Sequence, residues 1–306
     1  MKIRLISLFL LLCLLLSACG GEVPSPAEGG VTFTDALGRT VTVGSPRRVA
    51  ALLGSFADVW VLAGGDLCAA PEDAWEDFGL SQEAVNLGGA HSPSLEVLLS
   101  AAPDFVIASA STASNVEMLE TLEAAGITVA YFDVDNFGDY LAMLAICTDI
   151  TGRKDLYEQN GLQLQRQIEA IKAKTIPEDR RRVLMLRSSA SSIKAKGSRG
   201  TILGEMLADL GCVNIADSET GLLENLSVEA VIRQQPCHIF VVTMGSNTEA
   251  AVEGFRQMIE ENPAWSSLEA VKAGRIHMME KELYNLKPNA RWPEAYEKLY
   301  EILNNP

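Results

Sequence analysis

The sequence predicts an α/β protein of two similar lobes, each with a mostly parallel central sheet, joined by one long α-helix. Three observations predict this fold: a stretch that occurs twice, a regular alternation of apolar strand-like runs with helical segments, and one unusually long amphipathic helix. Such alternation is typical of parallel sheets that are covered by helices on both faces and connected by right-handed crossovers. A chain of 306 residues suffices for about two domains.

The repeated stretch is the clearest sign of two lobes. Its copies run over 94–108 and 227–242. Each has a Ser that can cap a helix, a Glu two residues later (Glu96 and Glu229), a short apolar helix, a Pro and a buried strand. The copies are too far apart for a solenoid repeat, so they fit two similar lobes in one chain.

The first 19 residues predict an export signal that is removed from the mature protein. Lys2 and Arg4 precede an apolar run, and the segment ends in Leu-Ser-Ala followed by Cys19. This ending resembles the lipobox of bacterial lipoproteins, in which the Cys is lipidated; the alternative is an ordinary secretory signal. We therefore expect an exported protein, anchored by lipid to the outer face of the bacterial cytoplasmic membrane. Residues 20–30, with several Gly and Pro, predict a flexible tether.

The N-terminal lobe is expected over 31–136. An alternating segment with a turn at Gly38 predicts a hairpin over 31–43, and 71–84 is acidic and irregular. Strands are predicted at 49–53, 67–70, 105–109 and 127–132, and helices at 56–63, 95–99 and 115–125.

Residues 137–176 predict a helical linker between the lobes. It contains a first helix at 137–150 and a strut helix at about 153–175, which would be about 35 Å long. Gly161 is the weak position of the strut. The C-terminal lobe follows over 177–306, with strands predicted at 182–186, 239–244 and 275–279, and helices at 201–210, 249–261, 265–273 and 291–303.

Composition and motifs exclude several functions. The net charge of −15 argues against a nucleic-acid partner, because phosphate binding needs a basic face. The common hydrolase, metalloprotease, P-loop and dinucleotide-binding motifs are absent, which argues against an enzyme. The four Cys of the mature chain show no CxxC spacing, so free thiols are favoured over zinc or disulfide pairs: Cys68, Cys147, Cys212 and Cys237.

A ligand is expected at the carboxyl ends of the strands, where open α/β sheets bind small molecules. The loop 187–199 is the most informative, since it brings four cations into an acidic protein: Arg187, Lys194, Lys196 and Arg199. A solvated surface loop is the alternative. Further candidates from other strand ends are Ser55, Phe56, His91, Ser111, Ser246 and Tyr284. His91 could reach a metal or haem iron, whereas Tyr284 could belong to the core and His238 and His277 are expected to be structural.

Several motifs, in this order, resemble the substrate-binding proteins of ABC importers for siderophore-bound iron, haem and vitamin B12. They are the lipobox, Asp35-x-x-Gly38-Arg39, Pro46 to Ala50, the first repeat copy, the strut helix and Lys287 to Trp292. The resemblance implies a helical-backbone periplasmic-binding-protein fold with a ligand in the cleft between two lobes. It also implies a dimeric membrane permease with its ATPase as partner, no cofactor, and no chemistry on the ligand.

The resemblance gives roles to the twin Glu and to the cationic loop. Glu96 and Glu229 occupy the places of the acidic residues that dock onto Arg pockets of the permease; the alternative is that both merely stabilise helix starts. The cations suit an anionic ferric siderophore, with haem or cobalamin as alternatives. The scattered His disfavour the sister proteins that bind free zinc or manganese. A surface lipoprotein enzyme or sensor on the same fold is a more remote alternative.

Overall fold

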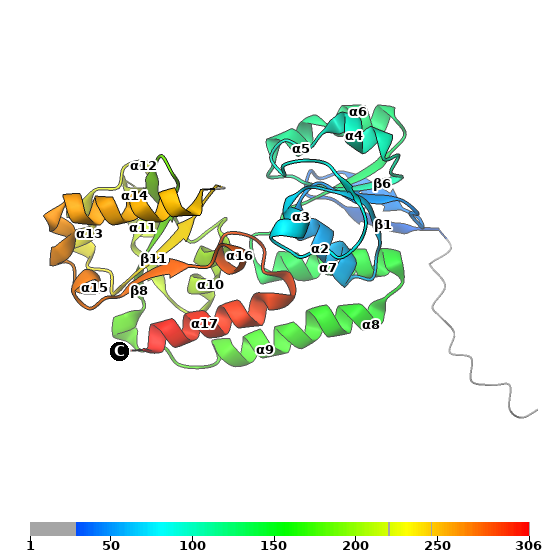
Figure 1. Cartoon of the computed structure of the whole chain (residues 1–306). Coiled ribbons are helices and arrows are strands. Elements are labelled where there is room, and N and C mark those ends of the chain that lie inside the picture. The colour runs from blue at the N-terminus through cyan, green and yellow to red at the C-terminus, as the bar shows by residue number, and fades with distance from the viewer. Residues whose placement is uncertain (1–28, 220, 246, 306) are drawn as a thin grey trace, which may run out of the picture.

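The computed structural model describes residues 29–305 except 220 and 246. The predicted signal, Cys19, most of the tether and Ser246 lie outside the described residues. Figure 1 shows two α/β lobes side by side, connected along one edge by long helices. Each lobe holds a five-stranded sheet, and a single strand pair of the two sheets, β8 with β9 in the C-terminal lobe, is antiparallel, so the predicted fold class is confirmed.

A hairpin opens the N-terminal lobe, as the alternating segment predicts. Strands β1 (Val31–Thr34) and β2 (Thr40–Val43) pair antiparallel. In the turn, Asp35 accepts hydrogen bonds from the backbone N–H groups of Leu37 and Arg39 and an ion pair from the Arg39 guanidinium at 2.6 Å. Gly38 adopts a φ of 77°, which favours glycine. Arg39 also pairs with Glu123 at 2.8 Å, which fastens the hairpin to the lobe.

The N-terminal sheet is entirely parallel, with the order β5-β4-β3-β6-β7. Its strands are β3 (Val49–Ala51), β4 (Leu67–Ala70), β5 (Val85–Asn86), β6 (Phe105–Ser109) and β7 (Thr128–Phe132). Its helices are α2 (Gly54–Leu62), α3 (Asp73–Glu76), α4 (Leu95–Ser100), α5 (Ala113–Glu117) and α6 (Leu119–Ala124). The single helix expected at 115–125 is therefore two helices with a break at Met118, and β5 is an unpredicted edge strand.

Two helical segments carry the chain from one lobe to the other. Helix α7 (Phe137–Thr151) begins with a capping box between Asn136 and Asp139 and ends at Gly152 in the left-handed region. The strut then runs without interruption through α8 (Lys154–Tyr157), a π turn η2 (Glu158–Leu162) and α9 (Gln163–Lys172). The strut is thus not one uniform α-helix, and it ends at Lys172. The π turn lies at Gly161, which is buried where the strut packs closely on α7.

The C-terminal sheet has the parallel order β10-β8-β11-β12, with β9 antiparallel to β8. Its strands are β8 (Arg182–Ser188), β9 (Ile193–Ala195), β10 (Val213–Asn214), β11 (His238–Thr243) and β12 (Ile276–Met279). Its helices are α10 (Ile202–Asp209), α11 (Ile215–Ser218), α12 (Gly221–Glu224), α13 (Val228–Gln234), α14 (Thr248–Glu261), α15 (Glu269–Lys272), α16 (Lys281–Tyr284) and α17 (Trp292–Asn304), with short 3-10 turns η3 (Glu178–Arg180), η4 (Pro263–Ser267) and η5 (Asn289–Arg291). The strands of the two sheets support our proposed lobe limits of 31–136 and 177–306.

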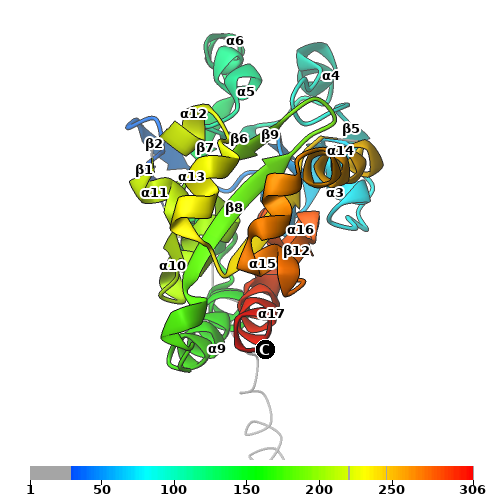
Figure 2. The same cartoon turned by 90° about the vertical axis from the view of Figure 1, so that its left-hand side faces the viewer.

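The final helix packs on the strut, as both views show (Figures 1 and 2). Lys174, just beyond α9, pairs with Glu297 of α17 at 2.7 Å, and the Tyr296 hydroxyl donates to Asp209 of α10 at 2.7 Å. The C-terminal helix therefore ties the strut to the C-terminal lobe.

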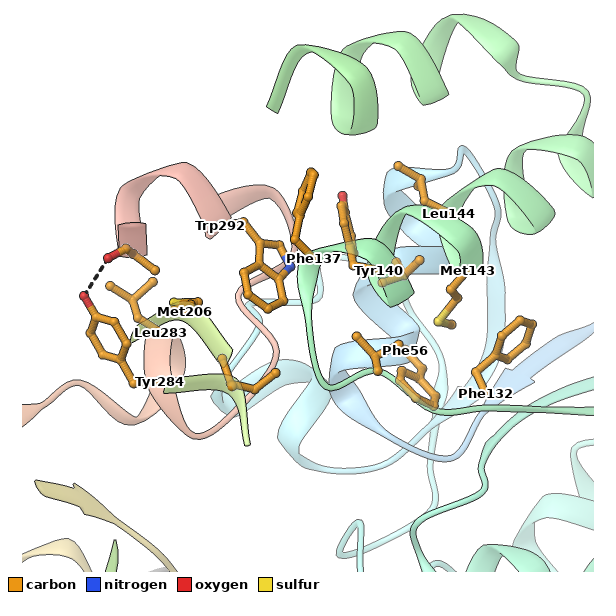
Figure 3. Packing of buried hydrophobic residues seen from close by; sticks show 14 of the residues in the cluster. Phe56, Phe132, Phe137, Tyr140, Met143, Leu144, Met206, Leu283, Tyr284 and Trp292 are labelled. Carbon is orange, nitrogen blue, oxygen red and sulfur yellow. Dashed lines mark hydrogen bonds between the residues drawn. The ribbon is translucent and has the colours of Figure 1, made fainter. Parts of the chain in front are cut away.

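One apolar core runs through both lobes and the linker. Figure 3 shows part of it, with Phe56 and Phe132 of the N-terminal lobe at one end and Tyr284 at the other. At its centre, the rings of Phe137 and Trp292 meet edge to face at 5.9 Å. Each sheet has a second, separate apolar core on its other face, one in the C-terminal lobe and one in the N-terminal lobe. Because the lobes share buried side chains, their relative orientation is fixed by packing as well as by the strut.

No helix among the described residues is long and apolar enough to cross a membrane.

Candidate functional site

The segment from α16 to η5 joins the C-terminal lobe to the N-terminal lobe. Lys281 pairs with Asp77 of the other lobe at 2.9 Å. The buried Asn289 donates from Nδ2 to the Ser55 carbonyl and to the Asp58 carboxylate, both at 2.8 Å. Burial raises the pKa of Asp58, and the hydrogen bond from Asn289 opposes this shift. We name this set of contacts the inter-lobe clasp.

Three predicted cations come together on the β8–β9 hairpin, and we call Arg187, Lys194 and Lys196 the basic cluster. Arg187 lies opposite Lys194 in the antiparallel register. The strand period of two places Lys196 on the same face as Lys194. The loop expected over 187–199 is therefore partly a hairpin, because β8 extends to Ser188 and β9 pairs with it.

The basic cluster is electrostatically uncompensated. None of its members forms an ion pair within 4.0 Å in the part of the chain that the structure describes, and the buried Nε of Arg187 has no hydrogen-bond partner there. Burial lowers the pKa of Arg187. Burial, followed by repulsion from Arg187 and Lys194, lowers the pKa of Lys196. A partly buried group of like charges without counter-ions is suited to an anionic ligand.

Lys287 adds a fourth cation that sequence analysis did not assign to the site. Burial and the positive charge of Arg187 lower its pKa, while Asp135 and Asp133 act in the opposite direction. Both carboxylates follow β7 in the N-terminal lobe, so Lys287 lies where the charges of the two lobes meet. In the sequence, Lys287 stands out only as part of the closing Lys-Pro-Asn motif, and that motif does not indicate where Lys287 lies in the folded protein.

Three predicted ligand contacts are core residues in this structure. The side chain of Phe56 is 1% exposed and packs edge to face with Phe132. Tyr284 is 2% exposed, and its hydroxyl donates to the Ala295 carbonyl at 3.0 Å. Ser55 is buried beneath the inter-lobe clasp. Position at a strand end did not decide the direction of the Phe56 and Tyr284 side chains, which belong to the shared core.

The remaining predicted contacts are exposed, namely His91, Ser111 and Arg199. The Ser111 hydroxyl lies 3.0 Å from that of Ser109. In the described chain, no group of three His, Cys, Asp or Glu side chains could hold a metal ion, so His91 has no partners of that kind there. The four described cysteines are free thiols.

His238 and His277 form a pair at the far end of the C-terminal sheet from the basic cluster. His238 Nδ1 lies 3.0 Å from His277 Nε2, and the rings stack with centroids 5.2 Å apart. Burial, then the positive charges of His277 and Arg275, lower the pKa of His238 to about 4. The pair is neutral at pH 7 and packs as part of the sheet.

Glu96 and Glu229 occupy equivalent positions in the two lobes. Each lies exposed in the first turn of its short helix, α4 or α13. The preceding Ser94 and Ser227 cap these helices by accepting a backbone N–H at 3.3 Å. The Glu229 carboxylate also accepts a hydrogen bond from the Ser227 hydroxyl at 2.9 Å. Figure 1 places α4 on one lobe and α13 on the other, so each lobe carries one of these exposed acidic residues.

The fold and the site define the class of protein: two α/β lobes joined by a helical strut, with uncompensated charges where the lobes meet, as in two-lobed binding proteins. The chain belongs to the periplasmic binding protein family, whose model matches residues 49–283.

Relatives and solved structures agree with this family. The Fe(3+)-citrate-binding protein YfmC of Bacillus subtilis is 25% identical over 302 residues, covering 92% of this chain and 90% of that protein. The uncharacterised ABC transporter substrate-binding lipoprotein YvrC of the same organism is 25% identical, covering 89% and 85%. The structure of Staphylococcus aureus SirA complexed with staphyloferrin B has a TM-score of 0.69 and 20% identity, covering 90% of this chain and 98% of that chain.

Proposed function

We propose that the protein is the substrate-binding lipoprotein of an ABC importer and captures an anionic ferric chelate between its lobes. The observation that carries the proposal is the basic cluster, in which three cations have no counter-ion within 4.0 Å among residues 29–305 other than 220 and 246, in a chain of net charge −15. The names of the relatives, one a ferric-citrate-binding protein and one an ABC transporter lipoprotein, support the same assignment. The ligand is carried to the permease unchanged.

The ligand class is tested by titrating the purified protein with ferric citrate, haemin and cobalamin. Arg187→Gln removes one charge of the basic cluster, and Arg256→Gln is the matched control, since Arg256 is exposed and already paired with Glu253 at 2.8 Å. We expect ferric citrate to bind, and Arg187→Gln to weaken it about tenfold through loss of a charge-assisted hydrogen bond. Preferential binding of haemin or cobalamin, or equal affinity of both variants for ferric citrate, would contradict this ligand class.

We further propose that Glu96 and Glu229 dock the two lobes onto a dimeric permease. Their exposure and equivalent positions support this role. Replacing both by Lys should abolish ferric citrate uptake by cells while leaving the affinity of the purified protein unchanged, because both are exposed and neither belongs to the basic cluster. Glu261→Lys together with Glu178→Lys, at exposed sites elsewhere, controls for net charge. Normal uptake by the Glu96/Glu229 double variant would refute the docking role.

The lipid anchor is a proposal that rests on the sequence around Cys19 and on the lipoprotein name of a relative. Metabolic labelling with a fatty acid should label the wild-type chain and not Cys19→Ser. A Cys19→Ser chain that is still labelled would contradict lipidation at Cys19.

A further inference from the structure

Lys287 is one of six charged side chains, from both lobes, that lie where the segment after α16 crosses between the lobes. The C-terminal lobe provides the basic cluster, and the N-terminal lobe provides Asp133 and Asp135. Burial, then repulsion from Asp133, raises the pKa of Asp135, and Lys287 opposes that shift. A Cβ atom on Gly200, which precedes α10, would lie 3.8 Å from Asp135 Oδ2, so the two lobes approach closely here.

The opposite charges nevertheless do not pair. Over the described residues, Lys287 forms no ion pair within 4.0 Å, and the carboxylates of Asp133 and Asp135 accept no hydrogen bond. In the inter-lobe clasp, in contrast, Asn289 contacts Asp58 at 2.8 Å and Lys281 contacts Asp77 at 2.9 Å. Unpaired opposite charges on two lobes that approach each other closely can both act on a third, charged group.

We infer that Lys287 is a further ligand-binding residue that completes the basic cluster, and that Asp135 opposes the bound anion and thereby promotes its release. The inference rests on the proposed function. It adds a specificity-determining cation from the C-terminal segment and a residue of the opposite lobe that limits affinity.

Electrostatics determines whether each side chain strengthens or weakens ligand binding. An anionic chelate on the basic cluster gains a favourable contact with Lys287 and an unfavourable one with Asp135, and both effects are strengthened by partial burial. In the empty protein, Asp135 also attracts the Lys287 ammonium and so competes with the ligand for it. Removing the carboxylate charge should therefore tighten binding, whereas removing the ammonium should weaken it.

The test is calorimetric titration with ferric citrate at two salt concentrations. We expect Lys287→Met to weaken binding about tenfold and to reduce its salt dependence, and Lys287→Arg to retain most of the affinity. Asp135→Asn should tighten binding about threefold and slow dissociation. The controls are Lys272→Met, an exposed lysine already paired with Glu269, and Asp179→Asn, an exposed acid; both should match the wild type.

The outcomes separate this inference from the proposed function. If the wild-type protein does not bind ferric citrate, the proposed ligand class is wrong and the inference falls with it. If the wild type binds but Lys287→Met binds equally well, Lys287 is not a ligand contact. If Asp135→Asn binds more weakly or no more tightly than the wild type, Asp135 does not oppose the ligand.

Discussion

Arg187 owes its role to its place at the end of a strand. The preceding alternate residues of β8, Val183 and Met185, point into the shared core, and Arg187 continues the same face beyond it. Its aliphatic stem can thus be buried while its guanidinium remains without a partner. The strand and the cation were predictable from sequence. The partial burial of Arg187 was not, because it depends on how segments that are distant in the sequence pack together.

The His238–His277 pair makes stability depend on pH. An unfolded His titrates near 6.5, whereas the folded pKa of His238 is lowered to about 4. As pH falls below about 6.5, the unfolded chain binds a proton that the folded chain does not, so the free energy of unfolding decreases down to about pH 4. Between pH 7 and 5 we expect a loss of about 2 kcal/mol from this residue.

Urea denaturation at pH 7 and pH 5 measures this loss. His238→Phe should lose less stability over that interval than the wild type, since Phe cannot bind the proton. The exposed His91→Phe is the matched control and should follow the wild type. Equal losses in all three proteins would show that the buried pair does not set the acid sensitivity.

Secondary-structure elements were predicted best where a continuous apolar run is bounded by polar residues or by Gly and Pro. β4 and β6 have the limits that the sequence predicted. The elements that were not predicted, β9 and the π turn, depend on contacts between separate segments, which a local sequence pattern does not reveal. β9 forms because Arg187 to Ser188 extends β8 far enough to pair with it, and the π turn at Gly161 forms where the strut packs on Leu141 and Leu144.

Two helical glycines show how packing decides the effect of the same substitution. A Cβ atom on Gly204 of α10 would overlap the backbone of Ser198, whose Cα lies 2.7 Å away, whereas a Cβ atom on Gly254 of α14 meets nothing within 4 Å. We expect Gly204→Ala to lower the free energy of unfolding by about 1–3 kcal/mol. Gly254→Ala should raise it by about 0.5–1 kcal/mol, since alanine favours the helix.

Chemical denaturation of both variants tests this packing. Because Ser198 belongs to the segment that follows the basic cluster, Gly204→Ala should also weaken ferric citrate binding, whereas Gly254→Ala should not. Equal stabilities of the two variants would mean that α10 does not contact the Ser198 backbone as closely as described.

At the scale of the whole molecule, the inter-lobe clasp and the shared core fix the arrangement of the lobes. Asn289 is central, because it is buried and bonds both Ser55 and Asp58 of the other lobe. Its φ of 51° is left-handed, which Asn and Gly tolerate better than most residues. A continuous strut and a shared core should limit lobe closure to a small rotation.

Asn289→Gly removes the amide while preserving the backbone conformation. It should lower the free energy of unfolding by about 1–3 kcal/mol, because it leaves the partly buried Asp58 carboxylate without its donor. A double-mutant cycle with Asp58→Ala should show a coupling energy of similar size. Additive effects of the two substitutions would indicate that the Asn289–Asp58 bond does not join the lobes.

The candidate site illustrates what sequence reasoning can and cannot reach. The two lobes, the strut and the cations of the hairpin follow from local patterns and from the order of motifs. Lys287 and Asp135 do not, since they lie far apart in the chain and meet only when the irregular segment after α16 crosses to the other lobe. Phe56 and Tyr284 were assigned to the ligand because their elements were placed correctly while the direction of their side chains was unknown.

The most direct test of the central claim is anomalous diffraction at the iron absorption edge from crystals grown with ferric citrate. We predict one strong iron peak between the lobes, with citrate oxygens in contact with Arg187 and Lys287. An iron peak on the outer surface of either lobe, or a citrate complex held without these two side chains, would contradict the proposed function and the further inference together.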